Sequence, residues 1–310
     1  MKINNVALIG LGAMGVFFAP RMEQHLGRDR FCVIAEGKRK ERLETKGVTV
    51  NGVNYKFPIC SPAKGRETDL IIMAVKDMAL DQAIADIKNF VGPNTQILCV
   101  MNGVESEERV AAVYGWDHVL YSYMRISIAL KDGKADFDPD GGKIYFGEKE
   151  NKTLTERVRA IKDLMEYCKI PYNIQEDMVR GLWYKFMCNV GENLTCALLG
   201  ICYGAFRKSS HANEIRFAGM KEVQAIANAK GIQLTDEDME RQNLTINRIA
   251  FYNRPSTLQD LDNHKKTEVE MFAGTVVRLG KELGIPTPVA WMYDQGIKVL
   301  EEKNAGLFEE

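Results

Sequence analysis

The chain has 310 residues, of which 45% are hydrophobic, so it is long enough for two domains and a sizeable core. Its 41 basic and 42 acidic side chains give a formal net charge of −1, which excludes a general attraction to nucleic acid or to an anionic membrane surface. The seven cysteines form no C-x-x-C pair, the four histidines show no metal-binding spacing, and no apolar run reaches about 18 residues; these features predict a cytoplasmic protein with reduced thiols, no metal site and no membrane span.

Residues 6–15 combine an apolar run with the glycine spacing G-x-G-x-x-G. The run from Val6 to Ile9 is typical of a buried strand, and residues 16–26 are compatible with a helix. In such a unit the first glycine permits a tight turn, the second lets a pyrophosphate approach the backbone, and the third lets the helix pack close to the sheet. The helix N-terminus also favours negative phosphates. The motif therefore predicts a dinucleotide-binding site formed by Gly10, Leu11, Gly12, Ala13, Met14 and Gly15.

A second strand-like run, residues 31–35, ends at Glu36. This carboxylate lies about 20 residues past the glycine motif, where an acidic side chain typically binds the ribose hydroxyls of a dinucleotide. Lys38 and Arg39 follow it. Glu36 and Lys38 are therefore predicted to contact the cofactor.

Strand-like and helix-like segments alternate from here to about residue 175. Residues 37–46 are compatible with a helix, and residues 47–59 predict a hairpin around the turn dipeptide Asn51-Gly52. The further strands are predicted at 69–75, 95–101, 118–130, 143–147 and 171–175, and the further helices at 78–90, from 105, and at 152–168. Continuous apolar strands that alternate with helices predict an α/β fold with a parallel, doubly wound sheet.

Two polar side chains directly follow strands of this predicted sheet. Lys76 follows the strand at 69–75, and Asn102 follows the strand at 95–101. Ligands of open parallel sheets bind beyond the carboxyl ends of the strands, so both residues are candidates to line the cofactor site. The alternative roles are a solvated loop lysine and a favoured turn residue.

The character of the sequence changes near residue 176. Residues 177–302 are helical almost throughout, and Gly284-Ile285-Pro286 is the clearest break. We therefore predict a dinucleotide-binding domain at 1–176 and an all-helical substrate and dimerisation domain at 177–310. Apolar surface on the helical domain makes a homodimer plausible.

A polar stripe runs along the predicted helix at 178–203. Lys185, Asn189 and Asn193 are spaced i, i+4, i+8 and share one helix face. Large apolar side chains flank them, which is typical of a buried helix. Because an unpaired buried polar group costs about 1–3 kcal/mol, the stripe is predicted to face a polar ligand. The alternative is an amphipathic helix whose polar side meets water.

Two later positions complete the candidate site. Ser256 precedes a predicted helix, where its alternative role is a capping box with Gln259. Glu268 lies in a Glu-rich segment, where its alternative role is an exposed helix carboxylate.

In order and with comparable gaps, these pieces resemble the ketopantoate reductase (2-dehydropantoate 2-reductase) family over nearly the full chain. The matching elements are residues 10–15, Ala74-Val75-Lys76, Met101-Asn102-Gly103, Trp183-Tyr184-Lys185 with Asn189, Ser256-Thr257-Leu258-Gln259-Asp260, Thr267-Glu268 and Gly284-Ile285-Pro286-Thr287-Pro288. The resemblance implies a Rossmann domain followed by a helical domain like that of 6-phosphogluconate dehydrogenase. It also implies NADPH-dependent reduction of 2-dehydropantoate to (R)-pantoate, a step toward pantothenate and coenzyme A.

The resemblance also implies a role for each candidate residue. Lys185, Glu268 and Asn102 resemble catalytic residues, and Asn102 matches the asparagine near the reacting carbonyl. Lys76 resembles a cofactor contact. The substrate contacts implied are Lys185, Asn189, Asn193 and Ser256. A cationic lysine can stabilise the negative charge that grows on the ketone oxygen and then supply the proton. Partial desolvation would lower a lysine pKa from about 10.4 toward the working range.

The sequence departs from the family pattern at two points. Glu36 stands where the family usually has a basic residue for the 2′-phosphate of NADPH. A carboxylate favours a free 2′-hydroxyl, whereas Lys38 and Arg39 could hold a phosphate, so NADH and NADPH both stay open. The chain also reads Gly191-Glu192-Asn193-Leu194-Thr195, without the proline that often follows this asparagine.

Two other functions stay open beside 2-dehydropantoate reduction. The first is a related dehydrogenase, of the opine type or acting on another 2-oxo acid. The second is a non-catalytic NAD(P)-binding sensor, against which the polar stripe argues because sensing needs no proton donor.

Overall fold

The computed structural model describes residues 1–308. The chain divides into two compact units, Met1–Val179 and the part from Arg180 onward. The first is an α/β unit and the second is helical. Among residues 1–308, no helix combines the length and the apolar character that crossing a membrane requires.

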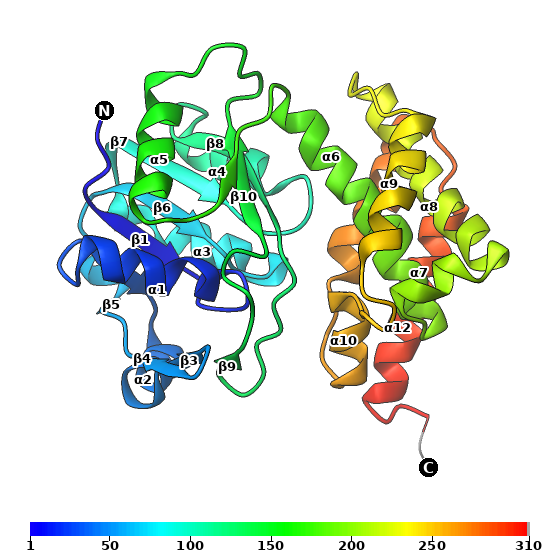
Figure 1. Ribbon diagram of the computed structural model, residues 1–310, viewed down its shortest axis with the longest axis horizontal. Coiled ribbons are helices and arrows are strands. Elements are labelled where there is room, and N and C mark those ends of the chain that lie inside the picture. The colour runs from blue at the N-terminus through cyan, green and yellow to red at the C-terminus, as the bar shows by residue number, and fades with distance from the viewer. Residues whose placement is uncertain (309–310) are drawn as a thin grey trace. The chain divides into compact units, whose positions relative to one another are not determined.

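The first unit is built on an eight-stranded sheet (Figure 1). Its strands are β1 (Val6–Ile9), β2 (Phe31–Ile34), β5 (Ile59–Cys60), β6 (Thr68–Met73), β7 (Val91–Cys99), β8 (Val119–Arg125), β10 (Lys143–Gly147) and β11 (Tyr172–Asn173). Their order is β11-β10-β8-β7-β6-β1-β2-β5. The strands from β8 to β5 in this order are parallel, whereas β10 is antiparallel to β8. The doubly wound sheet is therefore confirmed, with one antiparallel pairing that needs no crossover helix.

Helices cover both faces of this sheet. On one face lie α1 (Gly15–Leu26) and α5 (Glu156–Tyr167); on the other lie α3 (Leu80–Asp86) and α4 (Ser106–Tyr114). Successive residues of β1 alternate between the two cores, with Val6 and Leu8 on the α1 side and Ala7 and Ile9 on the α3 side. Because both faces are covered, the strand is apolar at every position.

A small second sheet and a short helix lie beside this core. The helix is α2 (Gly37–Lys46), and the strands β3 (Val48–Val50), β4 (Val53–Tyr55) and β9 (Lys134–Ala135) are ordered β4-β3-β9. Asn51 and Gly52 join β3 to β4 with φ of 48° and 79°, which confirms the predicted hairpin turn. Short 3₁₀ turns occur at η1 (Pro62–Lys64), η2 (Asp77–Ala79) and η3 (Lys88–Phe90).

The second unit is a bundle of helices. They are α6 (Met178–Cys188), α7 (Leu194–Leu199), α8 (Ser210–Ala229), α9 (Asp236–Arg248), α10 (Ser256–Asp262), α11 (Thr275–Leu283) and α12 (Pro288–Asn304). A 3₁₀ turn, η5 (Tyr203–Arg207), precedes α8, and two π-helical turns, η4 (Asn189–Asn193) and η6 (Glu270–Gly274), complete the unit. The helix predicted at 178–203 is thus interrupted: η4 separates α6 from α7.

The start of α12 is held by a carboxylate from α8. Glu222 is buried and accepts hydrogen bonds from the backbone N–H groups of Val289 and Ala290, at 2.7 and 2.8 Å. These amides belong to the first turn of α12, where no carbonyl within the helix can accept them. Glu222 therefore joins α8 to α12.

We expect Glu222→Ala to lower the free energy of unfolding by about 1–3 kcal/mol, because it leaves two amides without an acceptor. The control is Glu282→Ala, which removes only an exposed i,i+4 pair with Arg278 and should cost about 0.3–0.5 kcal/mol. Urea unfolding followed by circular dichroism measures both changes. Equal unfolding midpoints for the two variants would contradict this role of Glu222.

Candidate active site

The three glycines of the loop after β1 have different physical roles. Gly10 has a φ of +96°, and a Cβ there would lie 2.5 Å from the backbone of Ala74. A Cβ at Gly15 would overlap the carbonyl oxygen of Gly10, whereas nothing lies within 4 Å of a Cβ built on Gly12. Gly10 and Gly15 are therefore required for close packing, and Gly12 borders open space. This division fits a loop that a pyrophosphate approaches at its middle glycine.

The loop lies where the order of the strands reverses. From β1 the chain passes through α1 to β2 on one side, and it later enters β6 on the other side. The amide of Ala74, just after β6, donates to the carbonyl of Ile9 at 2.8 Å, so the two strands stay paired up to the loop. Such a switch point is the usual ligand position in doubly wound sheets.

Helix α1 begins directly from this loop. The amide of Val16 donates to the carbonyl of Gly12 at 3.0 Å. In the described chain, Met14 at the N-cap makes no side-chain capping hydrogen bond, and the first turn contains no acidic side chain. The positive end of the helix dipole therefore faces the loop, and no carboxylate among the described residues of that turn neutralises it. Such a helix end favours an anionic ligand.

The other predicted cofactor contacts lie at the same edge of the sheet. Lys76 follows β6 and is exposed, and Asn102 follows β7 and is half-buried. Glu36 and Lys38 follow β2 and are exposed. Since β7, β6, β1 and β2 are neighbours in that order, the fold brings these residues and the glycine loop to one edge.

Glu36 has a partner that the sequence did not indicate. It is the N-cap residue of α2, and its Oε1 accepts a hydrogen bond from the Ser61 hydroxyl at 2.9 Å. Ser61 follows β5, a strand of two residues that pairs with β2 through Ile34 and Cys60. The carboxylate is therefore oriented while it stays exposed.

In the second unit, the predicted substrate residues gather around η4. Lys185 is half-buried on α6; Asn189 is half-buried and Asn193 is buried on η4. Ser256 is the first residue of α10, and half-buried Glu268 lies just before η6. Because η4 contacts both α10 and η6, the segments that carry these residues are adjacent. Single π-helical turns occur frequently at functional sites.

The capping role of Ser256 is wrong. Pro255 is the N-cap of α10 and, within the described residues, no side chain caps this helix. Gln259 instead donates through Nε2 to the carbonyl of Arg254 at 2.6 Å. The Ser256 hydroxyl is exposed and is not consumed by the helix start.

Asn193 is oriented by a tyrosine. Its Oδ1 accepts a hydrogen bond from the Tyr203 hydroxyl at 2.7 Å. Burial, together with the negative charge of Glu192, raises the pKa of Tyr203 well above its ordinary value, so Tyr203 stays a neutral donor. The bond fixes the amide of Asn193 so that its NH2 group is the donating end.

A buried ion pair holds η4 against α8. Glu192 on η4 is 3% exposed and Arg216 on α8 is 1% exposed, with Oε1 and Nη1 3.4 Å apart. Gln242 donates to the other carboxylate oxygen at 3.1 Å. A Cβ at Gly191 would lie 2.8 Å from the carbonyl oxygen of Arg216, so glycine is required for this close packing. The Gly191-Glu192 pair that departs from the family pattern thus has a structural role, which no local sequence signal indicated.

We expect Gly12→Ala and Gly10→Ala to separate ligand binding from stability. If the pyrophosphate binds where the motif predicts, a methyl group at Gly12 takes part of its space, so the Kd for NADH or NADPH should rise by roughly tenfold while the unfolding midpoint stays the same. Gly10→Ala should lower the free energy of unfolding by about 1–3 kcal/mol or more, because its φ is left-handed. Titration calorimetry and urea unfolding test this pair. Wild-type affinity in Gly12→Ala would show that the pyrophosphate binds elsewhere.

Comparison with known proteins places the chain in a family. The family model described as Ketopantoate reductase PanE/ApbA matches residues 6–151, and the model of its C-terminal part matches residues 177–299. A protein of Streptococcus pyogenes serotype M3 named 2-dehydropantoate 2-reductase is 27% identical over 301 residues, which cover 96% of this chain and 97% of that protein.

Two solved structures have the same fold. D-mandelate dehydrogenase with NADH and anilino(oxo)acetate has a TM-score of 0.84 at 21% identity, covering 97% of this chain and 99% of that one. A dimeric ketopantoate reductase from Staphylococcus aureus has a TM-score of 0.80 at 18% identity, with the same coverage. The matched regions and the fold agree, and the chain belongs to the ketopantoate reductase family of oxidoreductases.

Proposed function

We propose that the protein reduces a small 2-oxo acid with a nicotinamide coenzyme, and that this acid is 2-dehydropantoate, which is converted to (R)-pantoate for pantothenate biosynthesis. The observation that carries the proposal is the gathering of Lys185, Asn189, Asn193 and Ser256 around one π-helical turn. Family membership adds the substrate. In this proposal residues 1–176 bind the dinucleotide, and residues 177–310 bind the substrate and form a homodimer.

The proposed chemistry assigns one task to each side chain. A bound reduced coenzyme supplies the hydride to the ketone carbon. Lys185 donates a hydrogen bond to the ketone oxygen, stabilises the negative charge that grows there, and supplies the proton that completes the alcohol. We assign to Glu268 the orientation of Lys185 or of the new hydroxyl, and to Asn102 a role at the reacting carbonyl.

The remaining polar groups suit a carboxylate-bearing substrate. Asn193 presents its NH2 group because Tyr203 occupies its amide oxygen. Ser256 carries a hydroxyl that its helix does not use. Together with Asn189 these groups donate hydrogen bonds to carboxylate oxygens, which accept only.

The coenzyme is NADH or NADPH, and we propose a preference for NADH. Ser61 orients Glu36 at the end of β2, where a carboxylate accepts hydrogen bonds from a free 2′-hydroxyl and repels a 2′-phosphate. Lys38 and Arg39 lie on the first turn of the following helix and act in the opposite direction. NADPH remains the expectation from the family resemblance.

A second candidate substrate is another 2-oxo acid. The fold neighbour D-mandelate dehydrogenase carries NADH and anilino(oxo)acetate, a 2-oxo acid derivative. A non-catalytic NAD(P)-binding sensor is the third reading, which any turnover would eliminate. We also propose a cytoplasmic location. Reduced thiols are typical of cytosolic proteins, and the described cysteines are all free thiols.

We expect Lys185→Ala to lower kcat by at least about a hundredfold, while the Kd for the coenzyme changes little. The reason is that the lysine acts on the ketone oxygen and not on the dinucleotide. Absorbance of the reduced nicotinamide with 2-dehydropantoate measures turnover. Lys281→Ala, an exposed lysine on α11, is the matched control. A kcat unchanged in Lys185→Ala would remove this lysine from the chemical step.

The coenzyme preference gives a separate prediction. The wild-type kcat/KM should be higher with NADH than with NADPH, and Glu36→Gln should shift the ratio toward NADPH by about tenfold, because it removes one negative charge near the 2′-phosphate. Glu41→Gln, an exposed glutamate on α2, controls for net charge. If Glu36→Gln and Glu41→Gln show the same ratio, Glu36 does not select the coenzyme.

A further inference from the structure

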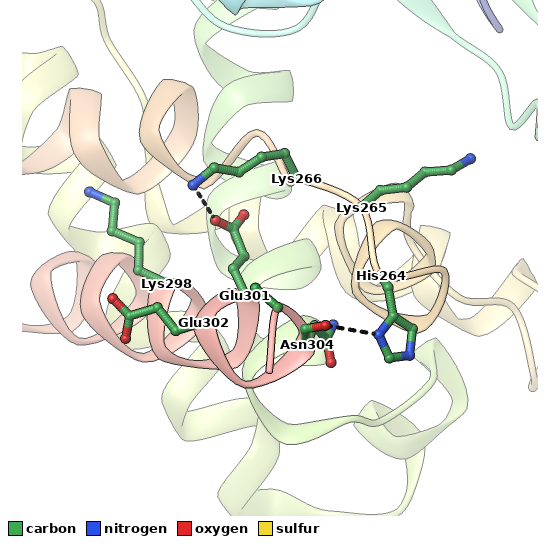
Figure 2. A pocket seen from close by; sticks show the side chains of 8 residues that line it. His264, Lys265, Lys266, Lys298, Glu301, Glu302 and Asn304 are labelled. Atoms are coloured by element: carbon green, nitrogen blue, oxygen red, sulfur yellow. Dashed lines mark hydrogen bonds and ion pairs between the residues drawn. The ribbon is translucent and has the colours of Figure 1, made fainter. Parts of the chain in front are cut away.

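Hydrogen bonds join the C-terminal part of α12 to the segment that carries Glu268. Figure 2 shows the pocket in which this occurs, with Glu301 pointing from α12 toward Lys266. The pocket of about 390 Å³ is lined by His264, Lys265, Lys266, Lys298, Glu301, Glu302, Asn304 and Ala305. Two of its lysines have carboxylate partners, one inside the lining and one outside it. Lys266 pairs with Glu301 at 2.8 Å, and Lys298 pairs with Asp294 at 2.9 Å.

The carboxylate of Glu301 makes three bonds to two consecutive residues. Its Oε1 accepts from the backbone N–H of Thr267 at 2.8 Å and from the Thr267 hydroxyl at 2.6 Å. Its Oε2 accepts from Lys266 Nζ at 2.8 Å. The Glu301 side chain is 9% exposed, whereas that of Lys266 is 73% exposed. The bonds to buried Thr267 therefore contribute most, because an exposed ion pair contributes little.

The charge of Glu301 persists over a wide pH range. Burial raises the pKa of Glu301, but the hydrogen bonds from Lys266 and Thr267 and the charge of Lys266 outweigh burial and lower the pKa below its ordinary value. The three bonds are therefore present at neutral pH and are lost only as the pH falls through this lowered pKa.

The bonded threonine fixes the backbone on both sides of Glu268. The Thr267 hydroxyl, besides donating to Glu301, accepts from the backbone N–H of Val269 at 3.2 Å. Val269 is 3% exposed, and η6 begins at Glu270. Glu268 thus lies between Thr267, whose backbone N–H is held by Glu301, and Val269, whose backbone N–H is held by Thr267.

We propose that Glu301 is a positioning residue for Glu268: it holds the 266–269 backbone so that the Glu268 carboxylate keeps its reacting orientation. The proposal rests on the proposed function, because Glu268 acts only if the protein reduces a 2-oxo acid. In this proposal Glu301, near the end of α12, affects the reaction through Glu268 and without contacting substrate or coenzyme itself. Small displacements of an orienting group lower turnover strongly.

The test compares four variants of the full chain in the 2-dehydropantoate assay with NADH and with NADPH. Glu301→Ala removes all three bonds, and Glu301→Gln keeps an amide oxygen for Thr267 but loses the charge. Thr267→Val has nearly the same shape as threonine and removes only the hydroxyl bonds. Glu302→Ala, an exposed glutamate that lines the same pocket, is the matched control.

We expect Glu301→Ala to lower kcat by about tenfold or more, with KM for 2-dehydropantoate and coenzyme changed less than about threefold. Glu301→Gln should recover part of this loss, Thr267→Val should lower kcat by several-fold, and Glu302→Ala should match the wild type. If Glu301→Ala does not fold, Thr267→Val decides alone.

A kcat within about twofold of wild type in Glu301→Ala, or in Thr267→Val where it decides alone, overturns the proposal. So does an equal loss in Glu302→Ala, or a loss expressed only as a higher KM for 2-dehydropantoate. If the wild-type protein oxidises neither coenzyme with 2-dehydropantoate or any other 2-oxo acid, the proposed function fails and this inference fails with it. An active wild type with an unaffected Glu301→Ala removes the inference alone.

Discussion

Close approach between backbones at two glycines is the constraint on which both groups of candidate site residues depend. A Cβ at Gly10 would lie 2.5 Å from the backbone of Ala74, and a Cβ at Gly191 would lie 2.8 Å from the carbonyl oxygen of Arg216. No side chain fits at either point without displacing the neighbouring backbone. In the first unit this approach lets β1 turn sharply into the loop before α1. In the second it lets the π-helical turn η4 pack directly on α8.

The electrostatic surroundings differ between the two places. At the glycine loop, the positive end of α1 meets open space beside Gly12, which suits a negative ligand. At η4, the carboxylate of Glu192 is buried with the guanidinium of Arg216, whose pKa burial lowers. Removing two charges from water costs several kcal/mol, so such a pair is poor evidence for stability. Its clearer consequence is orientation, since Asn193 follows Glu192 directly and is itself held by Tyr203.

The sequence predicted those features that depend on local patterns. The glycine spacing, the apolar strands and the Asn51-Gly52 turn each follow from residues close together in the chain. Features that depend on distant pairing were not accessible. Ser61 reaches Glu36 across 25 residues because a two-residue strand pairs with β2. The antiparallel β10 and the two π-helical turns likewise follow from tertiary packing. The capping box that was the alternative role of Ser256 does not form, because Pro255 occupies the N-cap.

The departures from the family pattern fall at positions that select ligands in the proposed function. In that proposal Glu36 faces the point where NADH and NADPH differ, and Gly191-Glu192 precedes the asparagine assigned to the substrate. Residues assigned to the chemical step, Lys185 and Glu268, match the family instead. Hydride transfer to a ketone makes the same demands whatever the 2-oxo acid, so in this proposal the choice of ligand depends on groups that contact other parts of the substrate or the coenzyme. In the proposed function, the hydrogen bond from Ser61 therefore bears on the choice of coenzyme through Glu36, and the buried pair at Glu192 bears on the substrate through the neighbouring Asn193.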